Sequence, residues 1–108
     1  MIPNVLEDKE AEEIHKKAQD LIDEGKTDKA LEILKVSAEK QPYSPIFQKS
    51  LGQAYLKKGE RDKAYEHYKA AFDLTPNDYE VLNQLGVLSG ERNQLQAAHT
   101  YLQRSLTI

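Results

Sequence analysis

The sequence predicts an all-α fold built from three pairs of helices, and two observations support this prediction. A pattern of small, aromatic, glycine and proline positions in the middle of the chain recurs at an offset of 34 residues on both sides. Its members are Leu51, Gly52, Tyr55, Gly59, Ala64, Tyr68, Ala71 and Pro76. Between the breakers, apolar residues recur at intervals of three and four, which is typical of amphipathic helices rather than strands. A fixed period of this length is typical of stacked helical units.

The first pair of helices is expected before Pro42. Asn4 and Glu7 have the spacing of a capping box, so the first helix should begin after Asn4, and Gly25 should end it. Its partner is expected from about residue 28 to residue 40, because Pro42 blocks continuation of a helix.

The second pair has equally clear boundaries. Ser44 followed by Pro45 predicts an N-cap with proline at the first helical position, and Gly59 predicts the end of this third helix. The fourth helix is expected to run to Leu74, and Pro76 closes the pair.

The third pair repeats the scheme with one change. Asn77 and Glu80 again have the spacing of a capping box, so the fifth helix should begin after Asn77 and run towards Glu91. Asn93 stands in the column of the turn glycines, where asparagine is the usual substitute because it tolerates the left-handed conformation. A sixth helix is expected from there to the end of the chain.

Two columns of the repeat predict how the helices pack. Small residues in the first helix of each pair are expected to face alanines in the second, which permits a close crossing. These positions are Ala18, Gly52 and Gly86 against Ala30, Ala64 and Ala98. Beside them lie Leu21 and Tyr55, but the third copy holds Ser89, so we expect the last turn to be less well packed.

Composition excludes several classes of protein. The 108 residues favour a single domain, and the absence of cysteine removes disulfides and thiolate metal sites, so we expect a reducing, cytoplasmic location. No apolar run is long enough to span a membrane, and the acidic residues near the start do not fit a secretory signal. A net charge of −3 with interspersed signs gives no basic surface, so neither nucleic acid nor a membrane is an expected partner.

Catalysis is not expected either, and we predict no enzyme, cofactor or metal. The 3 histidines are the main candidates for such chemistry, and no two of them have the spacing of a metal pair on one helix. His15 is expected on one side of the repeat array, whereas His67 and His99 are expected as exposed residues on the opposite side.

The 34-residue pattern resembles the tetratricopeptide repeat, over about residues 11–108. The resemblance implies one domain over 1–108 with repeats at about 11–44, 45–78 and 79–108, residues 1–10 extending the first helix. It also implies a right-handed α-solenoid of antiparallel helix pairs, whose first helices line a concave groove. The usual role of this family is to hold a peptide or another protein, and fold alone does not establish that role.

The family's groove columns can be placed on this chain. The set that we select as candidate binding residues is His15, Gln19, Lys49, Gln53, Leu56, Lys57, Asn83, Gln84 and Val87; Glu12, Lys16, Ile46, Ser50, Glu80 and Glu91 share the same face. Glutamine and asparagine amides both donate and accept, as the backbone of an extended peptide requires. Any one of these residues fits an ordinary solvated helix face better, but together they form a binding candidate.

A more specific family hypothesis is the carboxylate clamp, in which basic and amide side chains hold the C-terminal acid of a chaperone tail. This chain fits it poorly, because Glu80 occupies a basic position of the clamp and would repel a carboxylate. Starting one copy later places Lys49, Gln53 and Gln84 in clamp positions, but the basic pair then falls in a fourth copy that is absent.

The alternative function is self-association through the last helix. Leu102, Leu106 and Ile108 are counterparts of Tyr68, Phe72 and Leu74, which the following helix should cover. We therefore expect Leu102, Leu106 and Ile108, together with Tyr101, to pack against a second copy of the chain or against further sequence of a longer parent.

Overall fold

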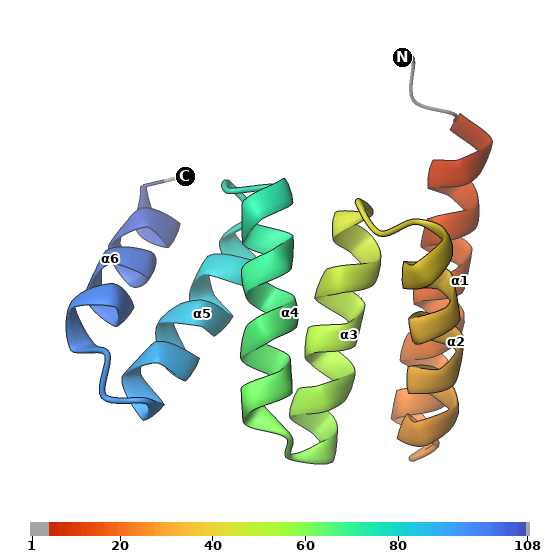
Figure 1. The fold of residues 1–108 in the computed structure, drawn as a ribbon, viewed down its shortest axis with the longest axis horizontal. Coiled ribbons are helices and arrows are strands. Elements are labelled where there is room, and N and C mark those ends of the chain that lie inside the picture. Colours follow the sequence, from red (N-terminus) through yellow and green to blue (C-terminus); the bar gives the residue numbers. More distant parts are fainter. Residues whose placement is uncertain (1–4, 108) are drawn as a thin grey trace.

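The computed structural model describes residues 5–107 of the chain, and its side chains from residue 9 onward. Over these residues it contains helices and no strands, as Figure 1 shows. The helices are α1 (Val5–Asp23), α2 (Thr27–Lys40), α3 (Pro45–Lys58), α4 (Arg61–Leu74), α5 (Tyr79–Glu91) and α6 (Leu95–Leu106). The all-α prediction is confirmed, and the predicted ends at Lys40, Leu74 and Glu91 agree with the structure.

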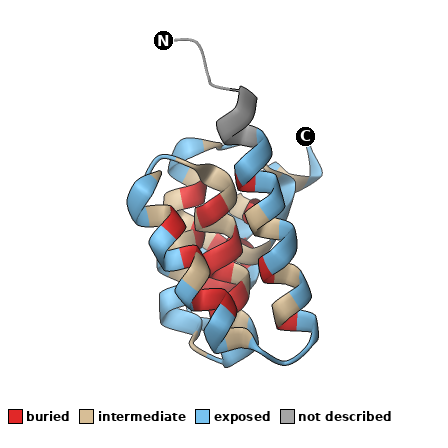
Figure 2. Ribbon diagram, turned by 90° about the vertical axis from the view of Figure 1, so that its right-hand side faces the viewer, coloured by how far each residue is buried: buried red, intermediate tan, exposed pale blue. Residues whose placement is uncertain are grey.

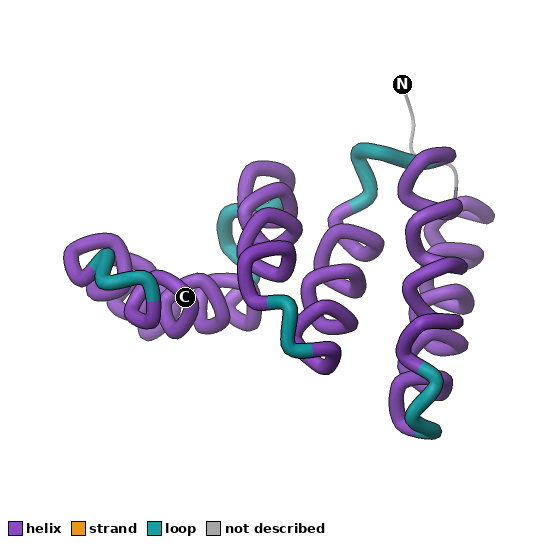
Figure 3. Tube along the Cα trace, turned by 60° about the horizontal axis from the view of Figure 1, so that its bottom comes forward, coloured by secondary structure: helices purple, strands orange, loops and turns teal. Residues whose placement is uncertain are grey.

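The helices form three antiparallel pairs that stand side by side along the chain (Figure 1). Each pair packs on the next, with α3 against both α1 and α2, and α5 against α4. Figure 3 shows that α5 and α6 are tilted strongly relative to the first pair. The extents of 38 × 36 × 20 Å correspond to an array that is two helices thick.

The three tight turns within the pairs have the same geometry. Gly25, Gly59 and Asn93 adopt φ values of 80°, 85° and 61°, in the left-handed region that glycine and asparagine tolerate best. The residue after each of them donates its backbone N–H to a carbonyl five residues back; these bonds run from Lys26 to Leu21, from Glu60 to Tyr55 and from Gln94 to Ser89. Such bonds satisfy carbonyls that a helix end leaves free, and the predicted turn chemistry is confirmed.

The predicted N-caps need correction. Helix α5 is capped by Asp78 and not by Asn77: one carboxylate oxygen of Asp78 accepts the N–H of Glu80 at 3.0 Å and that of Val81 at 3.4 Å. A carboxylate at this position can accept both free amides, whereas Asn77 accepts from Arg104 instead. Ser44 does occupy the N-cap of α3, but its side chain makes no capping hydrogen bond.

The caps of the first helix cannot be compared in this way. The capping box predicted from Asn4 and Glu7 rests on side chains that lie outside the described residues.

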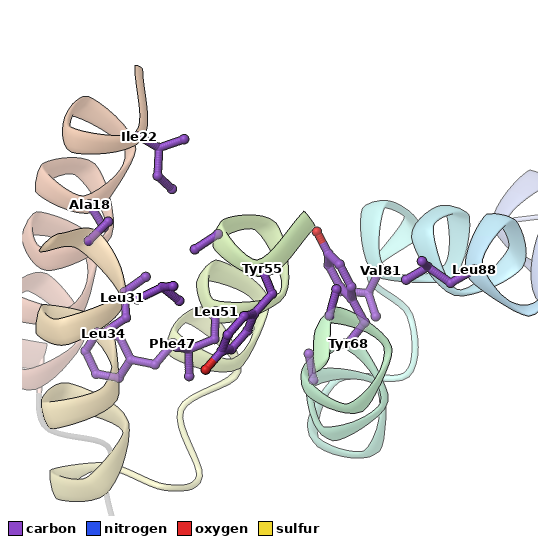
Figure 4. Close-up of a cluster of buried hydrophobic side chains, with 14 of the residues drawn as sticks. Ala18, Ile22, Leu31, Leu34, Phe47, Leu51, Tyr55, Tyr68, Val81 and Leu88 are labelled. Atoms are coloured by element: carbon purple, nitrogen blue, oxygen red, sulfur yellow. The ribbon is translucent and has the colours of Figure 1, made fainter. Parts of the chain in front are cut away.

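The core runs continuously through the array, along the faces where the helices meet (Figure 2). Leu34, Phe47 and Leu51 fill the junction of the first two repeats, and Tyr68, Val81 and Leu88 extend it into the third (Figure 4). No helix in the described part of the chain is both long and apolar enough to cross a membrane.

The close crossings within the second and third pairs place a larger residue against the glycine than predicted. A Cβ on Gly52 would lie 2.8 Å from the Tyr68 ring, and one on Gly86 would lie 2.5 Å from Leu102. The glycines of α3 and α5 therefore make room for the large residue one turn beyond the predicted alanine. This correction follows from the helix geometry, because residues four apart lie on the same face.

Ser89 differs from its counterparts as predicted, and the structure shows why. Tyr55 is buried by stacking on His67 in the second repeat. Ser89 is fully buried in the third, yet its hydroxyl has no hydrogen-bond partner. A small, unsatisfied polar group therefore replaces a packed aromatic ring at this turn.

Candidate functional site

One hollow of the surface lies on the side of the array formed by the first helices. It has a volume of about 400 Å³. Its lining comes from all three repeats and consists of Gln19, Ile22, Asp23, Gln53, Leu56, Lys57, Tyr68, Glu80 and Gln84. Five of the nine predicted binding residues are therefore brought together here: Gln19, Gln53, Leu56, Lys57 and Gln84.

Two glutamines connect the first repeat to the second across the hollow. The side-chain amide of Gln19 donates to the Oε1 of Gln53, and the two residues occupy equivalent positions in α1 and α3. This bond uses one donor of Gln19 and one acceptor site of Gln53. The carbonyl of Gln19 and the amide of Gln53 keep capacity for further partners, since each amide group both donates and accepts.

Lys49 lies beside the hollow and is held by two acidic residues at the start of α5. Its ammonium lies 2.9 Å from Oδ2 of Asp78 and 2.7 Å from Oε2 of Glu80, and all three side chains are at most half exposed. Partial burial opposes the charge, but the hydrogen bonds that Lys49 donates to the two carboxylates outweigh it and raise the pKa of Lys49. Lys49 therefore stays charged, with its charge already balanced inside the protein.

His15 is the remaining predicted residue from α1, and it also makes a contact between repeats. Its Nδ1 is paired with the hydroxyl of the fully buried Ser50. Burial lowers the pKa of His15, and the nearby charge of Lys49 lowers it further, although Glu80 and Glu12 act in the opposite direction. The side chain supports the packing of α1 on α3 and does not line the hollow.

Tyr68 is a lining residue that the sequence prediction missed, because it comes from a second helix. Figure 4 shows its ring rising from α4 between α3 and α5, with the hydroxyl pointing away from that of Tyr55. Burial raises the pKa of Tyr68, and Glu80 and Asp78 add to the shift, so the hydroxyl stays neutral and can both donate and accept. The sequence signal for this placement is Gly52, because a residue without a side chain leaves room for the Tyr68 ring.

Asn83 and Val87 stand apart from this arrangement. Both are exposed on α5 and neither lines the hollow. Ile22 and Asp23, which the prediction missed, line it instead from the end of α1.

His67 does not line the hollow. His67 is half-buried and not exposed as predicted: its ring stacks on Tyr55 with centroids 5.4 Å apart, and its Nδ1 donates to Oε1 of Gln48 at 2.9 Å. Burial lowers the pKa of His67. Among the side chains of residues 9–107, no three histidines or acidic residues gather as metal ligands would.

The predicted self-association residues divide into three groups. Leu102 and Leu106 on α6 are 37% and 84% exposed. Tyr101 is half-buried, because its ring packs edge-on against Phe72 with centroids 5.5 Å apart. Ile108 lies outside the described residues.

Comparisons with known proteins agree with this architecture. The family described as TPR repeat matches residues 52–90. The anaphase-promoting complex subunit CDC16 of Saccharomyces cerevisiae is 28% identical over 85 residues, which are 79% of this chain and 10% of that protein. The BBSome complex member BBS4 of Bos taurus is 40% identical over 57 residues, which are 53% of this chain and 11% of that protein. The chain thus spans about a tenth of the length of these relatives.

Among solved structures, the second tetratricopeptide-repeat domain of Spaghetti (RPAP3), bound to the HSP90 peptide SRMEEVD, has a TM-score of 0.81. It is 18% identical in sequence, and the match covers 90% of each chain. The fold and its internal period define an α-helical repeat protein. Together with the match of the TPR repeat model to residues 52–90, they show an all-α helical-repeat fold of the tetratricopeptide type.

Proposed function

We propose that the chain is a non-catalytic protein-interaction module that binds an extended peptide or a segment of a partner protein in its concave hollow. The observation that carries the proposal is the convergence of Gln19, Gln53 and Gln84, from three different repeats, on one hollow of about 400 Å³. Pockets of this size commonly hold ligands by a few placed polar groups over apolar walls, and Ile22 and Leu56 supply such a wall. The structural neighbour with a bound peptide supports the same role by analogy of fold.

The test is to select binders from a random peptide library and to map each binder by backbone and side-chain amide shifts. We expect the shifts to centre on Gln19, Gln53 and Gln84. The variant Gln53→Ala should lose about 0.5–1.5 kcal/mol of binding free energy for the neutral hydrogen bond removed. Gln96→Ala is the matched control, because it makes the same change on the exposed side of α6. Binders that map to the convex helices α2 and α4 would contradict the proposal.

A second candidate function is self-association through α6, which the exposure of its leucines favours. Leu102 is 37% exposed, whereas its counterpart Tyr68 is 1% exposed beneath the next repeat. Fully burying a leucine is worth about 1.5–3 kcal/mol, so Leu102 and Leu106 together favour association with a second copy.

Sedimentation over a wide range of concentration tests this alternative. Association should occur in the parent chain and disappear when Leu102→Lys and Leu106→Glu are combined. Val36→Lys is the control, since Val36 is an exposed apolar residue of α2 in the first repeat and should not matter. A parent chain that stays monomeric at all concentrations would exclude self-association through α6.

A further inference from the structure

The charge balance of the hollow restricts which peptides it can accept. Lys49 occupies a position of the carboxylate clamp if the clamp starts one copy later. It already forms ion pairs with both Asp78 and Glu80. This group of three carries one net negative charge. An incoming carboxylate would therefore have to displace an internal carboxylate from Lys49 while approaching the other.

The side chains that line the hollow also carry one net negative charge. Asp23 and Glu80 are acidic, and Lys57, which is exposed, is the basic residue among the lining side chains. Glu80 contacts Lys49 through Oε2, so its second oxygen keeps capacity to accept hydrogen bonds. The Gln19 carbonyl and the Tyr68 hydroxyl add further acceptors at the same hollow.

Building on the proposed function, we infer that the bound peptide places an arginine side chain in this hollow, with its guanidinium against Glu80 and the carbonyl of Gln19. A guanidinium presents five N–H donors in one plane, which suits several acceptors grouped around a carboxylate. Its apolar stem would lie along Leu56 and Ile22, as arginine stems commonly lie on apolar surface. A peptide recognised by its terminal carboxylate would find no unpaired cation at the Lys49 position.

The test uses N-acetyl-arginine amide as a probe of the side chain alone and N-acetyl-glutamate amide as its counterpart. Each is titrated into the full chain, and the side-chain amide signals of Gln19, Gln53 and Gln84 are followed. We expect saturable shifts of these signals with the arginine probe only. Equal or stronger shifts with the glutamate probe, or no shift with the arginine probe up to its solubility limit, would overturn the inference.

Two variants with opposite expected effects make the test independent of any one substitution. Glu80→Gln should weaken the arginine probe by about tenfold or more, since a hydrogen bond to a charged group is lost. Lys49→Met leaves Asp78 and Glu80 without their internal cation and should strengthen binding of the same probe. Glu66→Gln is the control, because Glu66 is an exposed acid on α4 away from the hollow. Unchanged binding in both Glu80→Gln and Lys49→Met would also contradict the inference.

The peptide selection separates this inference from the proposed function. If selected peptides map to the hollow but are not enriched in arginine and the arginine probe is silent, the inference alone is wrong. If selected peptides map elsewhere, the proposed function is wrong as well.

Discussion

The second and third repeats share one architecture but differ in how well their equivalent positions are filled. In the second repeat, Tyr68 packs over Gly52 and is 1% exposed, because α5 covers it. In the third, Leu102 packs over Gly86 in the same way and is 37% exposed. Similar local geometry thus gives a closed core in the second repeat and a partly open surface in the third, because α5 packs over α4.

A second difference lies at the turn of each repeat. Tyr55 closes the turn of the second repeat by stacking on His67, with the ammonium groups of Lys35 and Lys63 also near its ring. At the equivalent position Ser89 is buried without a hydrogen-bond partner. The backbone bond pattern is nevertheless the same in both turns. Repeat geometry is therefore set by the backbone, whereas the stability of each repeat depends on its side chains.

The largest contrast is expected from truncating the residue that packs on each glycine. Tyr68→Ala should cost about 3–5 kcal/mol of unfolding free energy, as for other large buried side chains. Leu102→Ala should cost only about 1–2 kcal/mol, because part of this side chain is already in water. Urea unfolding followed by helical circular dichroism measures both. Equal losses would mean that α6 is as well covered as α4 in solution.

The glycines themselves give the next largest effect. Gly52→Ala should destabilise the chain by about 1–2 kcal/mol, because the new methyl group would press on a Tyr68 ring that cannot move. Gly86→Ala should be nearly neutral, since Leu102 can turn towards solvent and alanine favours the helix by about 0.5–1 kcal/mol. The same unfolding measurement applies, and a greater loss for Gly86→Ala would refute the proposed freedom of Leu102.

Two fully buried serines provide a matched pair with a smaller effect. Ser50→Ala removes the partner of His15 and should cost about 0.5–1.5 kcal/mol. Ser89→Ala removes a hydroxyl that has no partner and should be neutral or slightly stabilising. Thermal unfolding of the two variants beside the parent compares them directly. A destabilised Ser89→Ala variant would indicate that Ser89 is hydrogen-bonded in solution.

The pH dependence of stability should show the smallest effect. Burial lowers the pKa values of His15 and His67 below the ordinary 6.5, so the unfolded chain binds protons first as the pH falls. Unfolding free energy should therefore decrease as the pH is lowered through and below this value, in a window above the titration of carboxylates. The double variant His15→Gln with His67→Gln should flatten this slope. An unchanged slope would show that other groups are responsible.

Much of the fold could be predicted because it depends on short segments of sequence. A left-handed turn needs glycine or asparagine, so Gly25, Gly59 and Asn93 indicate three turns without reference to the rest of the chain. Prolines at 42 and 76 and the apolar spacing between them delimit the helices in the same local way. The repeat adds a check that most sequences lack, because each position can be compared with its counterparts 34 residues away.

The composition of the candidate site was only partly predictable. Gln19 and Gln53 occupy equivalent positions on stacked helices, so they face the same side and both line the hollow. Gln84 belongs to the column of Ser50, and the third-repeat counterpart of Gln19 and Gln53 is Val87. Column positions do not show which way a side chain from another helix points, so the hydroxyl of Tyr68 was missed. They also placed Asn83 and Val87 in the binding set although neither lines the hollow.

The sequence by itself therefore determined the helices, their turns and their periodic pairing, because these follow from backbone preferences over a few residues. Only the tertiary structure decided which charges and hydrogen bonds meet across repeats. Lys49 is paired with Asp78, His15 with Ser50, and Gln19 with Gln53, over separations of 29, 35 and 34 residues. Such contacts depend on the angle and distance between neighbouring helix pairs, which the buried side chains at the junctions between the pairs set.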